Sequence, residues 1–245
     1  MSTQRFDTLD ALRGLALVWM AVFHLCFDLN HFGYWKQDFY NDPFWTGQRT
    51  CILSLFLFCA GLGQAVALHQ GQSRARFWRR WGQVAGCAVL VTAGSWLMYP
   101  QSFIYFGVLH GIALMLVVTR LTGGWGQWLW GLGALAIAAK FLAAQMLAGS
   151  ASAELFNAPG LNWLGLVTRK PVTEDYVPML PWLGVMWWGM AAGQWLLRRK
   201  PGLLTSPLSR PARPLATLGR WSLTFYMLHQ PVMIGVLMLV AALRA

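Results

Sequence analysis

The chain has 245 residues, of which 57% are hydrophobic and only 11% are charged, and its formal net charge is +11. Soluble domains average about 25% charged residues, and several apolar runs in this chain approach or exceed the roughly 20 residues that span a bilayer. These two properties exclude a soluble globular domain. The basic residues lie between the apolar runs, as in the cytoplasmic loops of membrane proteins, which argues against a nucleic-acid-binding protein.

An all-α polytopic membrane protein with seven transmembrane helices is predicted, organised as a single integral membrane domain over residues 1–245. The predicted spans are 10–32, 48–69, 81–99, 102–121, 124–147, 178–197 and 216–243. With these boundaries, 13 Lys and Arg residues fall on one side of the membrane and 5 on the other, and Lys140 within the fifth span completes the total of 19. Because basic residues concentrate in cytoplasmic loops, the N-terminus is predicted to be cytoplasmic and the C-terminus to lie outside.

These two groups of basic residues define the expected sides of the membrane. The cytoplasmic group is Arg5, Arg13, Arg74, Arg76, Arg79, Arg80, Arg120, Arg198, Arg199, Lys200, Arg210, Arg213 and Arg220. The outer group is Lys36, Arg49, Arg169, Lys170 and Arg244.

The first span carries two ionisable residues, His24 and Asp28, within an apolar segment. With Arg13 near the inner interface, a rise of ~1.5 Å per residue places His24 about 16 Å along the axis and Asp28 about 6 Å further out. Residues four apart share a helical face, so the Asp28 carboxylate is predicted to orient the His24 ring. Ionisable groups inside a bilayer are costly and often functional. His24 is therefore a candidate general base, and the alternative is a pair that only joins helices.

Two other predicted spans carry deep histidines, His110 and His229. Pro231, two residues after His229, would weaken the local helix and free backbone groups. Together with His24, these residues are predicted to line a shared cavity, in which His110 or His229 could donate a hydrogen bond to a developing oxyanion. Taken singly, each histidine is explained equally well as a hydrogen-bonding group between helices.

The loops predicted to lie outside are the aromatic and polar segment 33–47 and the longest connection, 148–177. Long loops in compact proteins are usually functional or disordered. The residues near these loops that are candidates for binding an acceptor or for catalysis are Asn30, His31, Arg49, Asp175 and Tyr176.

The predicted cytoplasmic side gathers arginines beside the spans and around an irregular linker, 200–214. The guanidinium group of an arginine can donate two parallel hydrogen bonds to one phosphate group. Contact with anionic lipid is nevertheless the simpler explanation for any one of these arginines. The candidate phosphate-binding residues are Arg13, Arg79, Arg80 and Arg220, with Asp10 predicted to orient Arg13.

Several motifs resemble a known family. They are Leu9-Asp10-Ala11-Leu12-Arg13-Gly14-Leu15-Ala16 followed by His24, Phe106-Gly107-Val108-Leu109-His110, Asp175-Tyr176-Val177-Pro178 with Pro181-Trp182, and Tyr226-Met227-Leu228-His229-Gln230-Pro231. The first motif resembles the opening of the transmembrane acyltransferase superfamily. All of them resemble the bacterial branch similar to the catalytic domain of heparan-alpha-glucosaminide N-acetyltransferase.

This resemblance implies transfer of an acyl group, usually acetyl, from cytoplasmic acyl-CoA to a sugar or glycan across the bacterial inner membrane. Acyl-CoA would be a cosubstrate held by the inner arginines, and no tightly bound cofactor is implied. The resemblance also implies that His24 or a near neighbour is the base. The animal enzymes of the family carry Asn where His24 stands, with their proposed catalytic His nearer His31, so both histidines remain candidates.

Two other functions are compatible with parts of the sequence. In a proton-coupled transporter, His24, Asp28 and Lys140 would form a proton relay, but the chain shows no repeated half with paired broken helices. A haem-binding electron carrier is disfavoured because His24 and His31 share one helix. No metal site is predicted, since the four cysteines form no C-x-x-C pair, and homo-oligomerisation is left open.

Overall fold

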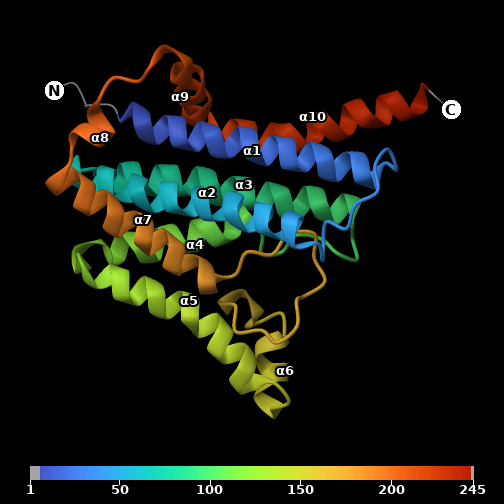
Figure 1. Cartoon of the computed structure of the whole chain (residues 1–245). Coiled ribbons are helices and arrows are strands. Elements are labelled where there is room, and N and C mark those ends of the chain that lie inside the picture. The colour runs from blue at the N-terminus through green and yellow to red at the C-terminus, as the bar shows by residue number, and fades with distance from the viewer. Residues whose placement is uncertain (1–5, 244–245) are drawn as a thin grey trace. The chain divides into compact units, whose positions relative to one another are not determined.

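The computed structural model describes residues 6–243, so Arg5 and Arg244 of the charge tally lie outside the described residues (Figure 1). The α-helices are α1 (Asp7–His31), α2 (Pro43–His69), α3 (Arg74–Met98), α4 (Val108–Leu121), α5 (Trp128–Leu147), α6 (Ala151–Asn157), α7 (Met179–Arg199), α8 (Gly202–Thr205), α9 (Arg213–Arg220) and α10 (Ser222–Ala242). Three short 3-10 helices are η1 (Gly123–Trp125), η2 (Asn162–Leu164) and η3 (Arg210–Ala212). Over residues 6–243, extended pairing is limited to one isolated bridge between Phe106 and Tyr176. The predicted all-α class is confirmed.

Each predicted span corresponds to a helix, and five helices are long and apolar enough to cross a membrane: α1, α2, α3, α5 and α10. Helix α4 is apolar but has only 14 residues. Helix α7 has 21 residues and is not among these five. A polytopic membrane architecture is confirmed, while the number of spans and the cytoplasmic N-terminus stay predictions.

Two predicted spans differ from the helices that form. The prediction that 102–121 is helical is wrong at its start, because α4 begins at Val108. The residues before it pair with the segment that precedes α7: the Val177 N–H donates to the Phe106 carbonyl at 3.0 Å, and the Glu174 N–H donates to the Ser102 carbonyl at 2.9 Å. The predicted last span, 216–243, is interrupted at Trp221, between α9 and α10.

The chain divides into two compact units. The first unit comprises the residues up to Phe56 and those from Pro201 onward, with α1, the first part of α2, and α8 to α10. The second unit, Leu57–Lys200, contains the rest of α2 and α3 to α7. A single integral membrane domain over residues 1–245 stays a prediction.

In the first unit, glycines let α9 approach the start of α1 closely. A Cβ added to Gly14 would lie 1.9 Å from the carbonyl oxygen of Leu215. A Cβ added to Gly219 would lie 1.8 Å from the carbonyl oxygen of Asp10. The two backbones are therefore in contact at a separation that only residues without a side chain allow.

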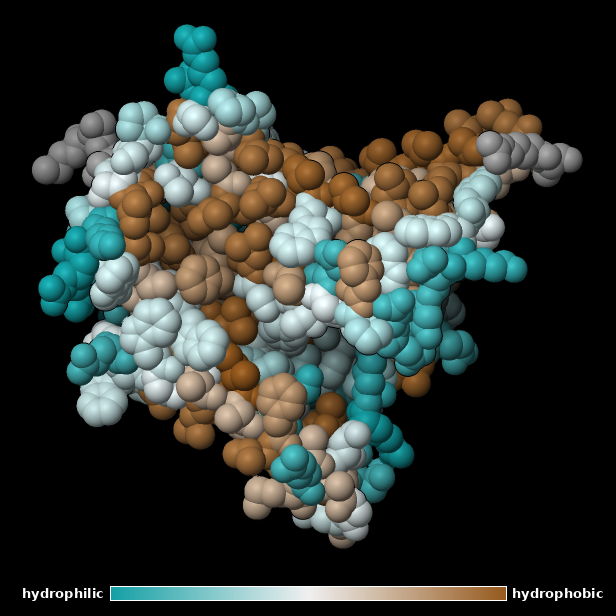
Figure 2. Space-filling view, in the orientation of Figure 1, coloured by the Kyte–Doolittle hydropathy of each residue, from teal (hydrophilic) through white to brown (hydrophobic). Residues whose placement is uncertain are grey.

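Beyond this contact, α10 lies beside α1 and runs in the same direction (Figure 1). Leu17 and Met20 on α1 are buried, and Phe225 and Tyr226 on α10 pack against the same cluster. Other side chains of α10 are apolar and exposed, as expected for a lipid-facing surface, and Figure 2 shows the hydrophobic colouring over this helix. They are Leu228, Val232, Val236, Met238 and Leu239.

In the second unit, α5 packs against α7 through facing glycines. A Cβ added to Gly184 would lie 2.4 Å from the carbonyl oxygen of Gly133. The buried residues of the adjoining core are Ala65, Leu129, Met190 and Ala191. The close contact between the helices follows from small residues, as is common in membrane helix packing.

Candidate functional site

In the first unit, α1 and α10 bring two histidine rings together. Nε2 of His229 lies 3.2 Å from Nδ1 of His24, and the ring centroids are 5.0 Å apart. His229 is buried and His24 is partly buried. The ring of Phe225 stacks on His229, with an interplanar angle of 8°. His24 and His229 thus lie in contact within the first unit. They are two of the three histidines predicted to share a cavity.

The hydrogen bonds of this pair determine which nitrogens carry protons. Nδ1 of His229 lies 2.7 Å from the carbonyl oxygen of Tyr226, and because a carbonyl oxygen only accepts, this Nδ1 carries a hydrogen. In the neutral ring, Nε2 of His229 is then an acceptor, so the hydrogen between the rings belongs to Nδ1 of His24. A ring nitrogen of His24 also bonds the backbone carbonyl of Met20, one turn earlier on α1. Assigning that bond to Nδ1 as well leaves the lone pair of neutral His24 on Nε2.

Asp28 contacts α10 rather than His24. Nε2 of Gln230 donates a hydrogen bond to Oδ1 of Asp28 at 3.3 Å. Within residues 6–243, no hydrogen bond or ion pair joins the side chains of Asp28 and His24. The predicted orientation of His24 by Asp28 is therefore not found, because the His24 ring is turned toward His229. Asp28 is 3% exposed, and in the described part of the chain neither its Oδ2 nor Oε1 of Gln230 has a hydrogen-bond partner.

In the second unit, His110 is held by a threonine. The Thr92 hydroxyl donates to the Ile104 carbonyl at 2.7 Å, so it accepts from Nε2 of His110 at 3.0 Å. Nδ1 of His110 is then an acceptor, and it is buried without a hydrogen-bond partner among the residues that the structure describes. His110 thus lies at the start of α4 with one nitrogen engaged and the other unpaired.

Asp175 caps the same helix. Its Oδ2 accepts a hydrogen bond from the backbone N–H of Val108 at 2.7 Å, which satisfies one of the donors left free at a helix start. A Cβ added to Gly107 would lie 2.4 Å from this oxygen. Asp175, which is predicted to bind the acceptor, therefore caps the start of α4.

Tyr176, next in the chain, joins a network that the sequence did not suggest. Its hydroxyl donates to the Asn162 carbonyl at 2.6 Å, and Nδ2 of Asn162 donates to the Tyr105 hydroxyl at 2.7 Å. Burial raises the pKa of Tyr176, and the neighbouring Tyr105 raises it further, so the phenol stays neutral and can donate. An Asn in a polar loop gives no pattern by which its burial could have been predicted.

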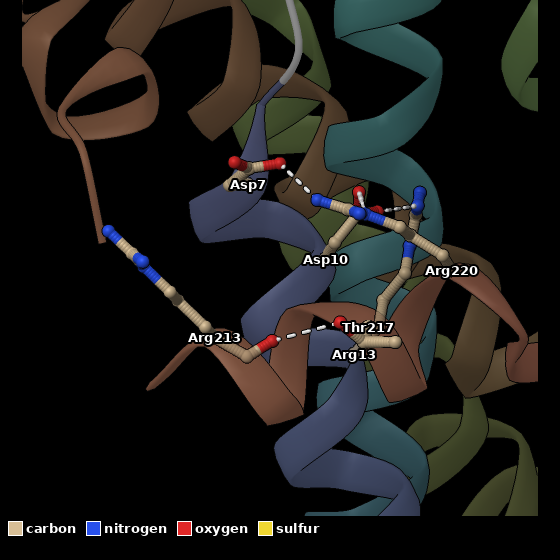
Figure 3. Close-up of polar contacts among 6 residues, drawn as sticks. All are labelled: Asp7, Asp10, Arg13, Arg213, Thr217 and Arg220. Atoms are coloured by element: carbon tan, nitrogen blue, oxygen red, sulfur yellow. Dashed lines mark hydrogen bonds and ion pairs between the residues drawn. The ribbon is translucent and has the colours of Figure 1, made fainter. Parts of the chain in front are cut away.

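At the start of α1, four charged side chains form an inner cluster, Asp7, Asp10, Arg13 and Arg220 (Figure 3). Nη1 of Arg13 donates to Oδ1 of Asp10 at 3.2 Å. Nη2 of Arg220 lies 2.9 Å from Oδ1 of Asp7, and its Nε lies 3.7 Å from Oδ2 of Asp10. The Arg213 side chain points away from this cluster. The positive charges of the two arginines are thus balanced by the negative charges of two carboxylates.

The other predicted site residues lie outside these clusters. His31, Arg49, Arg79 and Arg80 are exposed, and of these His31 lies near enough to Asp28 to interact with its charge. Oδ1 of Asn30 accepts the backbone N–H of Gln37 at 2.7 Å, which ties the loop after α1 to the helix. Lys140 is exposed on α5. Among residues 6–243, no group of three or more His, Cys, Asp or Glu side chains could hold a metal ion.

Comparison with known proteins identifies one family. The model of the family described as "Heparan-alpha-glucosaminide N-acetyltransferase, catalytic" matches residues 5–231. No curated protein and no solved structure gives a significant match. The matched range runs from before Asp7 to beyond Gln230, so it includes the inner cluster and the His24–His229 pair.

Proposed function

Since the chain belongs to the heparan-alpha-glucosaminide N-acetyltransferase catalytic family, we propose that it transfers an acetyl group from cytoplasmic acetyl-CoA to a sugar or glycan at the outer side of a bacterial inner membrane. The observation that carries this proposal is the His24–His229 pair, which leaves Nε2 of His24 unprotonated. A fixed, neutral imidazole on a membrane helix suits general base catalysis.

In the proposed reaction, Nε2 of His24 removes a proton from the amine or hydroxyl of the acceptor as that atom attacks the thioester carbonyl carbon. A C–N or C–O bond forms and the C–S bond of acetyl-CoA breaks. The proton held by His24 then passes to the sulfur of the departing CoA, so free CoA and the acetylated acceptor are the products. His24 ends the cycle neutral.

His229 is proposed to act through His24. Its Nε2 accepts from Nδ1 of His24 whether Nε2 of His24 is protonated or not, so the ring keeps its orientation throughout the step. The backbone carbonyl of Tyr226 holds the His229 tautomer. His229 is thus a positioning residue, and the carboxylate usual in such a role is replaced by a second imidazole.

The inner cluster is proposed to bind the phosphates of CoA through Arg13 and Arg220. Each guanidinium has five N–H donors, and the contacts with Asp7 and Asp10 use only some of them. The two carboxylates would hold both guanidinium groups in place while the remaining N–H donors face a phosphate. The exposed Arg79 and Arg80 would contribute to the basic surface that attracts CoA.

The proposal is tested by incubating membranes that contain the protein with labelled acetyl-CoA and analysing the envelope sugars by mass spectrometry. Labelled acetyl groups are expected on a sugar with the wild-type protein and not with His24→Ala. No labelling of any acceptor would contradict the proposal. Proton-dependent solute flux in vesicles without CoA would instead support the proton-coupled transporter.

A further inference from the structure

We propose that Asp28 and Gln230 form an acceptor subsite that binds two neighbouring hydroxyl groups which do not react. This inference rests on the proposed acyltransferase function and adds a specificity-determining site to it. The two side chains come from α1 and α10, the helices that also carry His24 and His229.

The first observation is that two buried acceptor atoms lack a donor. Asp28 is 3% exposed, and its single hydrogen bond, from Nε2 of Gln230, reaches Oδ1. Oδ2 of Asp28 and Oε1 of Gln230 are both buried without a partner among residues 6–243. Burying polar atoms unpaired is costly, so this arrangement is expected where a ligand supplies the missing donors.

The second observation is the position of the pair. Asp28 lies four residues beyond His24 on α1, about 6 Å along the axis at ~1.5 Å per residue, and Gln230 directly follows His229. The unpaired oxygens are therefore carried about one helical turn from the proposed base, a spacing of ~6 Å that a single sugar ring can span. A ligand that reaches both would present one group to His24 and others to Asp28 and Gln230.

The chemistry of the two oxygens selects the ligand. A carboxylate oxygen and an amide oxygen both accept hydrogen bonds and donate none. Adjacent hydroxyl groups of a sugar supply two donors side by side, one for each oxygen. Asp28 is the more deeply buried of the two residues, and a buried polar atom without a partner is costly, so most of the affinity is assigned to Asp28.

We expect Pro231 to provide the route to this pair. It follows Gln230 within α10 and lacks the N–H that would bond to the backbone carbonyl one turn earlier. Helices bend at such positions. Bending of α10 beyond Gln230 would uncover Asp28 and Gln230 without separating His229 from His24.

The test measures binding without turnover. Purified full-length protein is titrated with D-glucosamine, its 3-deoxy and 4-deoxy analogues, and cyclohexylamine, in the absence of acetyl-CoA. The variants are Asp28→Asn, Gln230→Met and a matched control, Asp38→Asn. The control removes an exposed carboxylate that accepts hydrogen bonds from Asn41 in the loop after α1. A thermal melt of each variant confirms that it is folded.

Wild-type protein is expected to bind glucosamine, with Kd raised about tenfold to a hundredfold by Asp28→Asn. At least one deoxy analogue should show a similar loss, Gln230→Met a smaller one, and Asp38→Asn none. No glucosamine binding, or an unchanged Kd in folded Asp28→Asn, would overturn the subsite. Cyclohexylamine binding that equals glucosamine binding and depends on Asp28 would also overturn it, because the site would then recognise a cation.

A parallel acetyl-transfer assay separates this inference from the proposed function. If glucosamine binds through Asp28 but no acetyl group is transferred, the acyltransferase proposal fails and the subsite stands. If acetyl transfer occurs and Asp28→Asn leaves the KM for glucosamine unchanged, the subsite fails and the acyltransferase stands. His24→Ala is expected to lose transfer.

Discussion

Nε2 of His229 accepts a hydrogen bond from Nδ1 of His24 across 3.2 Å, while Nδ1 of His229 donates to the Tyr226 carbonyl at 2.7 Å. This chain of bonds has one direction, because the carbonyl at its end can only accept. It leaves Nε2 of His24 with a lone pair. The reactive tautomer of His24 is therefore set by a backbone carbonyl of α10 that lies two hydrogen bonds away.

Replacing His229 tests this relationship. His229→Leu is expected to lower kcat about a hundredfold, at the lower end of what a general base contributes, with the KM for acetyl-CoA unchanged. His229→Gln offers an amide oxygen to Nδ1 of His24 and should recover part of the activity. Steady-state kinetics of the two folded variants provide the measurement. Equal activity of His229→Leu and His229→Gln would indicate that His229 does not act through a hydrogen bond to His24.

The contact between α9 and α1 should tolerate no side chain at Gly219. In Gly219→Ala, the new Cβ would lie 1.8 Å from the Asp10 carbonyl oxygen, and overpacking of this kind costs about 1–3 kcal/mol. Gly235→Ala on α10 is the matched control, because no atom lies within 4 Å of its added Cβ. Thermal melts should show a lower Tm for Gly219→Ala alone. Equal Tm values would contradict the backbone contact.

Arg220 should affect acetyl-CoA binding more than stability. Its ion pair with Asp7 is partly exposed, with side-chain exposures of 35% and 41%, and such pairs contribute about 0–1 kcal/mol. Arg220→Ala is therefore expected to raise the KM for acetyl-CoA several-fold with little change in Tm. Arg213→Ala, whose side chain points away from the cluster (Figure 3), should leave KM unchanged. Equal effects of the two variants on KM would point to general surface charge instead of a phosphate site.

Asp175 should act on the stability of the second unit. Asp175→Ala removes the oxygen that accepts the Val108 N–H, and loss of a helix N-cap costs about 0.5–2 kcal/mol. We expect a lower Tm with unchanged KM for the acceptor. Asp175→Asn keeps a side-chain oxygen and should be milder. A raised acceptor KM at unchanged Tm would restore the acceptor-binding role expected from the sequence.

Most of the helices could be predicted because long apolar runs leave few other structures in a bilayer. The start of α4 could not be predicted. Residues 102–107 are mostly apolar, but they pair with residues 173–177, and a contact between segments so distant in the sequence leaves no local pattern. Likewise, the spacing of His24 and Asp28 indicated a shared helical face but not which neighbour each side chain meets. That choice depends on α10 lying beside α1, and a single sequence carries no signal for it. The contact of Gln230 with Asp28 could not be predicted for the same reason.

We propose that His24, and not His31, is the base of an acetyl transfer. The most direct measurement compares transfer of labelled acetyl from acetyl-CoA by wild-type protein, His24→Ala and His31→Ala, with each variant shown to be folded. His24→Ala is expected to lose about a hundredfold to ten-thousandfold in kcat, while His31→Ala, which removes an exposed ring, should retain most activity. Intact transfer in His24→Ala together with its loss in His31→Ala would contradict the claim.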